Sequence, residues 1–176
     1  MISTLYLSYD GLTDPLGQSQ VLPYIIGLKQ NVKCSFTIIS FEKENNFKIN
    51  KKIIENILKE NSINWISLKY TKRPPVFSTI WDIYKLKNTI KPLIKNGIHL
   101  IHCRSYITSI VALKFKRKNK IPFIFDMRGF YADERVDGKI WDKKHFIFKY
   151  IYNYFKKKEK EFIEESNHIV SLTAAG

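Results

Sequence analysis

The fold is decided by a stretch in which an apolar segment runs directly into a cluster of charges, Ile121-Pro122-Phe123-Ile124-Phe125-Asp126-Met127-Arg128-Gly129-Phe130-Tyr131-Ala132-Asp133-Glu134-Arg135. The first part, residues 121–126, is apolar up to Phe125 and predicts a buried strand of a parallel sheet, because such strands are covered on both faces. The acids, arginines and aromatic side chains that follow would lie beyond the carboxyl end of that strand. Ligands of open α/β sheets bind outside those ends, so the stretch predicts one wall of a binding cleft.

Apolar segments of strand length alternate with amphipathic segments of helix length along the rest of the chain. Such alternation is typical of a doubly wound sheet whose parallel strands are joined by right-handed crossovers. We therefore expect an α/β fold, a Rossmann-like doubly wound parallel sheet of about six strands in the order 3-2-1-4-5-6. Strands are predicted at residues 4–9, 35–41, 64–70, 100–105, 121–126 and 168–172, and helices at residues 19–30, 48–61, 78–96, 107–118 and 143–165.

Composition places the chain among globular proteins and leaves its partners open. With 176 residues, 44% of them hydrophobic, the chain is long enough for one domain with its own core. A formal net charge of +14 favours an anionic partner, namely nucleic acid, an anionic membrane surface or a phosphorylated substrate. A lysine-rich composition throughout the chain would explain the same excess, so the charge alone selects no function.

Neither the cysteines nor the first residues indicate a metal site, secretion or a membrane span. Cys34 and Cys103 lie in apolar runs outside any CxxC pair, and the histidines lack the spacing of zinc ligands. No segment has the roughly 20 apolar residues of a spanning helix, and residues 1–7 lack the basic start of a signal peptide. We expect a cytoplasmic protein without a metal, whose contact with a membrane would be peripheral.

The first loop, residues 10–18, lies between the first predicted strand and the first predicted helix. This arrangement would place unpaired backbone N–H groups at the helix start, where an anion can bind. Gly17 would permit a close backbone approach there. The loop has no G-x-G-x-x-G pattern and the chain has no Walker A motif, which argues against a dehydrogenase or a P-loop enzyme.

Three segments together carry a resemblance to a known family. They are Tyr6-Leu7-Ser8-Tyr9-Asp10-Gly11-Leu12-Thr13-Asp14-Pro15-Leu16-Gly17-Gln18-Ser19-Gln20, then Phe125 to Arg135 with Gly138 and Trp141, and finally Ile169-Val170-Ser171-Leu172-Thr173. In this order they resemble glycosyltransferases of the GT-B type, the large retaining class numbered family four (glycosyl transferase group 1). The second segment resembles a polysaccharide-synthesis branch of that family, and the likeness covers essentially all 176 residues.

The resemblance implies half of a two-domain enzyme. GT-B proteins have two Rossmann-like domains facing across a cleft, of which the first mainly contacts the acceptor and the second holds the nucleotide-sugar. Residues 1–176 would be the N-terminal, acceptor-side Rossmann-like domain, ending in a domain boundary at residues 173–176. The C-terminal nucleotide-sugar-binding domain would be absent from this chain, so we expect the chain alone to be inactive. No cofactor or metal is implied, since the nucleotide-sugar donor is a substrate.

Asp126 and Arg128 are the residues that we expect to take part in catalysis. An aspartate at this strand end could accept a hydrogen bond from the acceptor hydroxyl and help to orient or deprotonate it. Arg128 could bind an anionic acceptor group or the diphosphate in a bidentate manner. The alternative is an internal Asp–Arg pair that closes the strand end.

A further set of residues is expected to bind the acceptor. Arg104 and Ser105 would end the fourth strand and open onto the same cleft, and Tyr131 would offer a face for stacking on a sugar. The alternatives are an ordinary turn at the first helix start and solvated charges in the loop after residue 130, and His102 is interpreted as a packed core histidine. The predicted acceptor-binding residues are Asp14, Gly17, Gln18, Arg104, Ser105, Tyr131 and Glu134.

Contact with a lipid surface is a separate expectation. The helix at residues 143–165 mixes aromatic and basic side chains, and a basic cluster lies at residues 114–120. Basic-aromatic surfaces bind anionic headgroups, so a lipid-linked acceptor and peripheral contact with an anionic inner membrane are expected. A core-facing aromatic stripe with a solvated lysine face is the alternative explanation of the helix.

The resemblance predicts a function in surface polysaccharide synthesis, such as that of capsule or lipopolysaccharide. In it, a retaining glycosyltransferase would move a sugar from a nucleotide-sugar to a saccharide or lipid-linked acceptor. Two other functions stay open, a stand-alone Rossmann-like module that binds an anion or nucleic acid, and the N-terminal half of a GT-B-like sugar epimerase. Nucleic acid is the less expected partner, because the chain lacks an RNA-binding signature.

Overall fold

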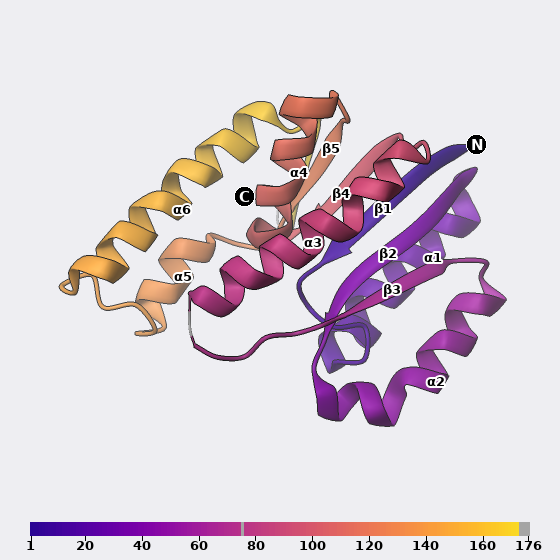
Figure 1. Ribbon diagram of the computed structural model, residues 1–176, viewed down its shortest axis with the longest axis horizontal. Helices are drawn as coiled ribbons and strands as arrows, with labels where there is room; N and C mark the ends of the chain where they lie inside the picture. The colour runs from indigo at the N-terminus through magenta and orange to yellow at the C-terminus, as the bar shows by residue number, and fades with distance from the viewer. Residues whose placement is uncertain (75, 173–176) are drawn as a thin grey trace.

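The computed structural model describes residues 1–74 and 76–172, whose strands form one parallel sheet with helices on both faces (Figure 1). The sheet has six strands in the order β3-β2-β1-β4-β5-β6, which confirms the predicted fold class and strand order. Residue 75 and residues 173–176 lie outside the described residues. The domain boundary expected at residues 173–176 therefore lies outside them as well. The strands are β1 (Ile2–Ser8), β2 (Cys34–Glu42), β3 (Asn64–Lys69), β4 (Leu100–Arg104), β5 (Phe123–Met127) and β6 (His168–Ser171).

The helices that connect these strands differ in places from the sequence-based expectation. Ser105 was expected to end the fourth strand, which is wrong: it adopts a positive φ of 70°, and the chain passes from β4 straight into a helix. Residues 131–137, expected to be a charged loop, form a short helix. The helices are η1 (Gly17–Val21, one π-helical turn), α1 (Leu22–Asn31), α2 (Glu44–Glu60), α3 (Phe77–Lys95), α4 (Ser105–Asn119), α5 (Tyr131–Asp137) and α6 (Phe146–Glu165).

Alternate residues of each strand point to opposite faces, so the sheet has a separate apolar core on each side. In β1, Leu5 and Leu7 belong to the core under α3, α4 and α6, whereas Tyr6 belongs to the core under α1 and α2. Figure 1 shows α3 and α4 in front of the sheet and α1 behind it. The position of a residue along its strand therefore decides which helices it meets.

The first loop packs tightly against the start of η1. A side-chain carbon added to Gly17 would lie 2.6 Å from Cα of Leu12 and closer still to the carbonyl oxygen of Gly11. Only glycine fits between these backbone atoms, which confirms the close approach expected for this loop. The backbone N–H of Gln18 donates to the carbonyl oxygen of Asp14 at 3.0 Å, so the loop leads directly into the helix.

We predict that Gly17→Ala lowers the free energy of unfolding by about 2 kcal/mol or more, because backbone atoms must move to admit the methyl group. Gly27→Ala is the matched control. Gly27 lies in α1 with nothing within 4 Å of an added side-chain carbon. Alanine favours a helix over glycine by about 1 kcal/mol, so this variant should be at least as stable as the wild type. Urea unfolding measures both values, and equal stabilities of the two variants would contradict the prediction.

Candidate functional site

The ends of β1, β4 and β5 meet at the carboxyl edge of the sheet, where the sequence predicts a cleft. The parallel register pairs Ser8 with Arg104 and Arg104 with Asp126, so these residues lie in one row on one face. Tyr6 and His102 form the preceding row on the same face, which is the face covered by α1. The structure thus brings Arg104 and Asp126 together, as expected.

Gln20 joins segments of the site that are far apart in the sequence. Its Oε1 accepts a hydrogen bond from Nη2 of Arg104 and another from Nη2 of Arg128, each 2.8 Å long. Nε of Arg104 also donates to Oδ2 of Asp10 at 3.2 Å. The start of the first helix, the end of β4 and the end of β5 are therefore held together through one amide oxygen.

Asp10 and Gln20 were not among the predicted site residues. Asp10 follows β1, so the rule of strand ends that identified Asp126 applies to it as well. The sequence does not indicate whether Gln18 or Gln20 contacts the arginines, because this depends on where the helix begins. The helix begins with η1, in which Gln20 reaches the two arginines and Nε2 of Gln18 donates to the carbonyl oxygen of Thr13 at 3.0 Å.

The Asp126 carboxylate is buried and incompletely satisfied. The residue is 4% exposed, and its Oδ1 has no hydrogen-bond partner in the part of the chain that the structure describes. Nη1 of Arg128 lies 3.7 Å from this oxygen, an ion pair too long for a hydrogen bond. Burial raises the pKa of Asp126 above its ordinary value, and the charges of Arg128 and Arg104 oppose that rise. The Asp–Arg pair considered as the alternative exists, but it leaves Oδ1 able to accept a hydrogen bond.

Two more buried polar atoms lie in the row beside this carboxylate. Among the described residues, neither the Tyr6 hydroxyl nor Nε2 of His102 has a hydrogen bond of ordinary geometry. The rings of Tyr6 and Tyr24 pack against the His102 ring, with centroids 4.8 and 5.6 Å away. Burial lowers the pKa of His102 to about 4, so the imidazole is neutral at pH 7. His102 is the packed core histidine that the sequence predicts.

The Tyr6 hydroxyl responds to the same charged groups. Burial raises its pKa, the carboxylate of Asp126 raises it further, and the guanidinium of Arg104 lowers it. The Arg104 side chain is buried, whereas that of Arg128 is partly exposed. The partly exposed Arg128 can therefore bind an anionic group, whereas the unpaired Oδ1 of Asp126 is buried beside it.

The predicted acceptor-binding residues of the first loop hold the loop itself. Asp14 is buried, and its carboxylate accepts hydrogen bonds from Nζ of Lys43 at 2.7 Å and from Nδ2 of Asn46, which ties the loop to α2. Gly17 and Gln18 make the packing and hydrogen-bond contacts described above. A role of these residues in binding an acceptor stays a prediction.

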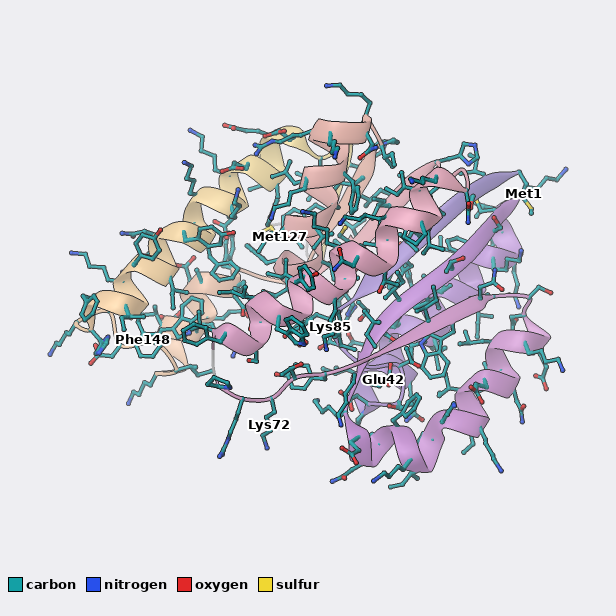
Figure 2. The ribbon with its side chains drawn as sticks, viewed as in Figure 1. Met1, Glu42, Lys72, Lys85, Met127 and Phe148 are labelled. Atoms are coloured by element: carbon teal, nitrogen blue, oxygen red, sulfur yellow. The ribbon has the colours of Figure 1, made fainter. Side chains whose placement is uncertain are left out.

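Glu42, the last residue of β2, binds the same loop, and Figure 2 labels it there. Its Oε1 accepts hydrogen bonds from the backbone N–H of Leu12 at 2.8 Å and from Oγ of Ser40 at 2.5 Å. Its Oε2 accepts from the backbone N–H of Thr13 at 3.0 Å and from the hydroxyl of the same residue. Glu42 is 3% exposed, so these charge-assisted bonds replace the water that the carboxylate loses on folding.

Tyr131 lies in an aromatic cluster. Its ring stacks on Tyr106 with centroids 5.4 Å apart and packs against Phe155 at 4.9 Å. The guanidinium of Arg135 lies 5.0 Å from the centroid of the Tyr131 ring. These contacts arise because residues 131–137 form a helix instead of a loop, and stacking of Tyr131 on a sugar stays a prediction.

Glu134 and Ser105 lie beside the ends of β5 and β4, which carry Asp126 and Arg104. A side-chain carbon added to Gly129 would lie 3.0 Å from Cδ of Glu134, so the Glu134 carboxylate covers the turn after β5. Gly129 has a φ of 140°, a conformation that favours glycine. Ser105 follows Arg104 directly, as the first residue of α4.

The aromatic side chains of α6 divide between the core and the surface. Phe155 and Phe162 are buried, as the core-facing explanation of this helix expects, whereas Phe146 and Tyr150 are exposed. In the basic cluster at residues 114–120, Arg117 is paired with two glutamates of α6. None of the helices within the described residues has both the length and the apolar character needed to cross a bilayer. Membrane contact stays a prediction.

The charged side chains of this site are carboxylates and guanidinium groups. Over residues 1–74 and 76–172, no three histidine, cysteine, aspartate or glutamate side chains gather where they could hold a metal ion. Both cysteines are free thiols, and burial raises the pKa of the Cys103 thiol.

Comparison with solved structures places this fold among those of GT-B glycosyltransferases. A UGT transferase from Siraitia grosvenorii, in complex with UDP, matches with a TM-score of 0.64 and 12% identity over 98% of this chain and 45% of its own. MurG from Acinetobacter baumannii matches with a TM-score of 0.54 and 10% identity over 98% of this chain and 42% of its own. The chain therefore spans less than half of either protein, and at these identities the likeness shows the fold alone. No protein-family model matches the sequence, and no curated protein matches it significantly.

We predict that Glu42→Ala lowers the free energy of unfolding by about 3 kcal/mol or more, because several buried donors lose their acceptor at once. Glu44→Ala is the matched control, since Glu44 is an exposed carboxylate at the start of α2 that pairs with Lys48 and Lys69. It should cost much less, because water replaces its partners. Guanidinium unfolding compares the variants, and a loss for Glu42→Ala no larger than that for Glu44→Ala would refute the proposed role of this carboxylate.

The stability should also depend on pH through His102. The unfolded chain takes up this proton near the ordinary pKa of 6.5 and the folded chain only near 4, so the stability present above pH 6.5 falls as the pH falls to 4. Between pH 7.5 and 4.5 the wild type should lose about 2–3 kcal/mol more than His102→Phe. The raised pKa of Asp126 acts in the opposite direction, but it is present in both proteins and cancels. Identical pH profiles of the two proteins in urea unfolding would exclude this contribution.

Proposed function

We propose that this chain is the acceptor-side half of a retaining glycosyltransferase. The observation that carries the proposal is the buried Asp126 carboxylate, whose Oδ1 has no hydrogen-bond partner among the described residues although Arg128 and Arg104 lie nearby. The fold, shared with halves of GT-B glycosyltransferases, supports sugar transfer as the reaction class.

In the proposed reaction, the Arg128 side chain moves aside on acceptor binding, and the acceptor hydroxyl then donates a hydrogen bond to Oδ1 of Asp126, which is buried in the structure. This bond orients the hydroxyl oxygen toward the anomeric carbon of the donor sugar, and the carboxylate helps to take the proton as the new glycosidic bond forms. The raised pKa of Asp126 favours this role, because it brings the carboxylate closer in basicity to neutral pH. The bond between the sugar and the diphosphate breaks on the same face, which retains the anomeric configuration.

Arg128 binds the anionic partner in this proposal, either the leaving diphosphate or an anionic group of the acceptor. Its partly exposed guanidinium is held at one Nη by Gln20, which leaves further donors for phosphate oxygens. A cation fixed before the reaction stabilises negative charge that develops on the leaving group. Arg104 acts as the buried neighbour that keeps Gln20 and Asp10 in place.

A nucleotide-sugar is the proposed donor, and a second domain is proposed to hold it. The UGT transferase that matches this chain is a complex with UDP, and more than half of its length lies outside the match. We infer that residues 1–176 alone do not transfer sugar. Surface polysaccharide synthesis on the cytoplasmic side of the inner membrane is the proposed setting, which rests on the resemblance of residues 125–135.

Asp126→Asn is predicted to lower kcat by about 10²- to 10⁴-fold, because an amide cannot take the hydroxyl proton. The variant is made in a protein that joins residues 1–176 to a nucleotide-sugar-binding domain, and release of the nucleoside diphosphate measures transfer. Asp137→Asn, at the exposed end of α5, is the matched control and should leave the rate unchanged. Near-normal turnover of Asp126→Asn would remove this carboxylate from the chemistry.

A further inference from the structure

A cavity of about 650 Å³ lies between α3, α5 and α6, on the face of the sheet opposite Asp126. Its volume is within the range of small-molecule sites, roughly 300–1,000 Å³. Isoleucines from three helices, Ile83, Ile110 and Ile151, contribute to its lining. Most of the remaining wall is aromatic and includes Tyr9, Tyr70, Tyr131, Trp141, Phe148 and Phe155.

The charged side chains at this cavity are both cations. Lys72 lies on the loop between β3 and α3, and Arg135 comes from α5, where its guanidinium rests over the ring of Tyr131. None of the described residues that line the cavity is an aspartate or a glutamate. Figure 2 labels Lys72 on the loop and Phe148 near the beginning of α3. An apolar wall with cations alone fits a molecule that has a hydrocarbon part and an anionic group.

Exposed apolar side chains surround the opening. Ile80 of α3 and Tyr150 of α6 line the cavity and are nevertheless 58% and 74% exposed. Phe77, Trp81 and Phe146, on the same turns of these helices, are exposed as well. Single apolar residues on a surface are ordinary, but a group of them around a cavity marks an interaction surface. Figure 1 shows that α3 begins next to α5, and residues of both helices line the cavity.

Basic residues flank the same opening. Residues 139–149, which connect α5 to α6 and include its first turn, contain four lysines and one carboxylate, Asp142. All four lysines are exposed. An apolar opening among lysines matches the boundary between headgroups and hydrocarbon in an anionic lipid layer.

We propose that this cavity binds the hydrocarbon chain of a lipid phosphate and that Lys72 and Arg135 bind its phosphate. Tyr9 directly precedes Asp10, and Tyr131 follows Arg128 by three residues. A headgroup beside these tyrosines therefore lies at the same edge of the sheet as Asp126 and its neighbouring arginines. The lipid is either the acceptor itself, which rests on the proposed function, or a phospholipid of the bilayer.

Calorimetric titration of the chain with decyl phosphate tests the site. Decyl phosphate should bind, and butyl phosphate should bind at least about a hundredfold more weakly, because each methylene removed from water strengthens binding by up to about fourfold. Ile80→Asp places a carboxylate at the opening and should weaken decyl phosphate binding by at least about tenfold. Ile53→Asp is the matched control, because Ile53 is 56% exposed on α2, and it should change binding by less than about twofold.

Lys72→Gln tests the contribution of the phosphate group separately from that of the hydrocarbon part of the ligand. Lys72 is exposed, so the variant should fold normally. Because it lacks the positive charge, it should bind decyl phosphate more weakly and bind decanol as the wild type does. The proposal is overturned if decyl phosphate does not bind, if it binds no better than butyl phosphate, or if Ile80→Asp binds it unchanged. Sedimentation tests the competing explanation that the apolar opening is an interface between two copies of the chain. If decyl phosphate does not bind, the chain dimerises and Ile80→Asp abolishes the dimer, that explanation replaces the proposal.

Flotation with vesicles of phosphatidylglycerol and phosphatidylcholine distinguishes the two sources of lipid. Flotation that decyl phosphate suppresses supports a bilayer phospholipid in the cavity. Binding of decyl phosphate without flotation supports an individual lipid phosphate, as an acceptor would be. These measurements need no sugar transfer, so a failure here and a failure of the Asp126 test are distinguishable.

Discussion

The buried carboxylate of Glu42 is the constraint on which the candidate site depends. Donors from Leu12, Thr13 and Ser40 converge on its two oxygens. Removing a carboxylate from water costs several kcal/mol, and charge-assisted hydrogen bonds offset that cost only while every donor stays in place. The first loop therefore has one position relative to β2, and Gly11 packs against the same carboxylate.

The position of the first loop determines the position of the charges beyond it. Asp10 lies at the beginning of the loop, and Gln20 lies just past its end, on η1. Through these two residues the loop binds Arg104, and through Gln20 it also binds Arg128. Two guanidinium groups repel each other, so a shared acceptor and nearby carboxylates are needed to hold them side by side. A carboxylate at the end of one strand thus controls the electrostatics at the end of another.

The fold could be predicted because its signals are local. Continuous apolar runs such as residues 121–125 favour buried parallel strands, and parallel strands place their carboxyl ends at one edge. That rule located Asp126, Arg104 and Arg128. Gln20 and Glu42 could not be found in this way, because their partners lie far away in the sequence and depend on strand register and helix start. The positive φ of Ser105 likewise has no local signal, since few residues other than glycine adopt it.

The two faces of the sheet can accept amino-acid substitutions independently, because they carry different groups of residues. None of the described residues that line the apolar cavity belongs to the polar group of Asp126, Arg104, Arg128 and Gln20. Substitutions in the aromatic wall can therefore accumulate while the polar group keeps its geometry, and the reverse holds as well. The two groups are nevertheless close along the chain, because Tyr9 directly precedes Asp10 and the segment around Gly129 carries the chain from the end of β5 into α5. A side-chain change on one face of such a sheet can therefore be made without rebuilding the groups on the other face.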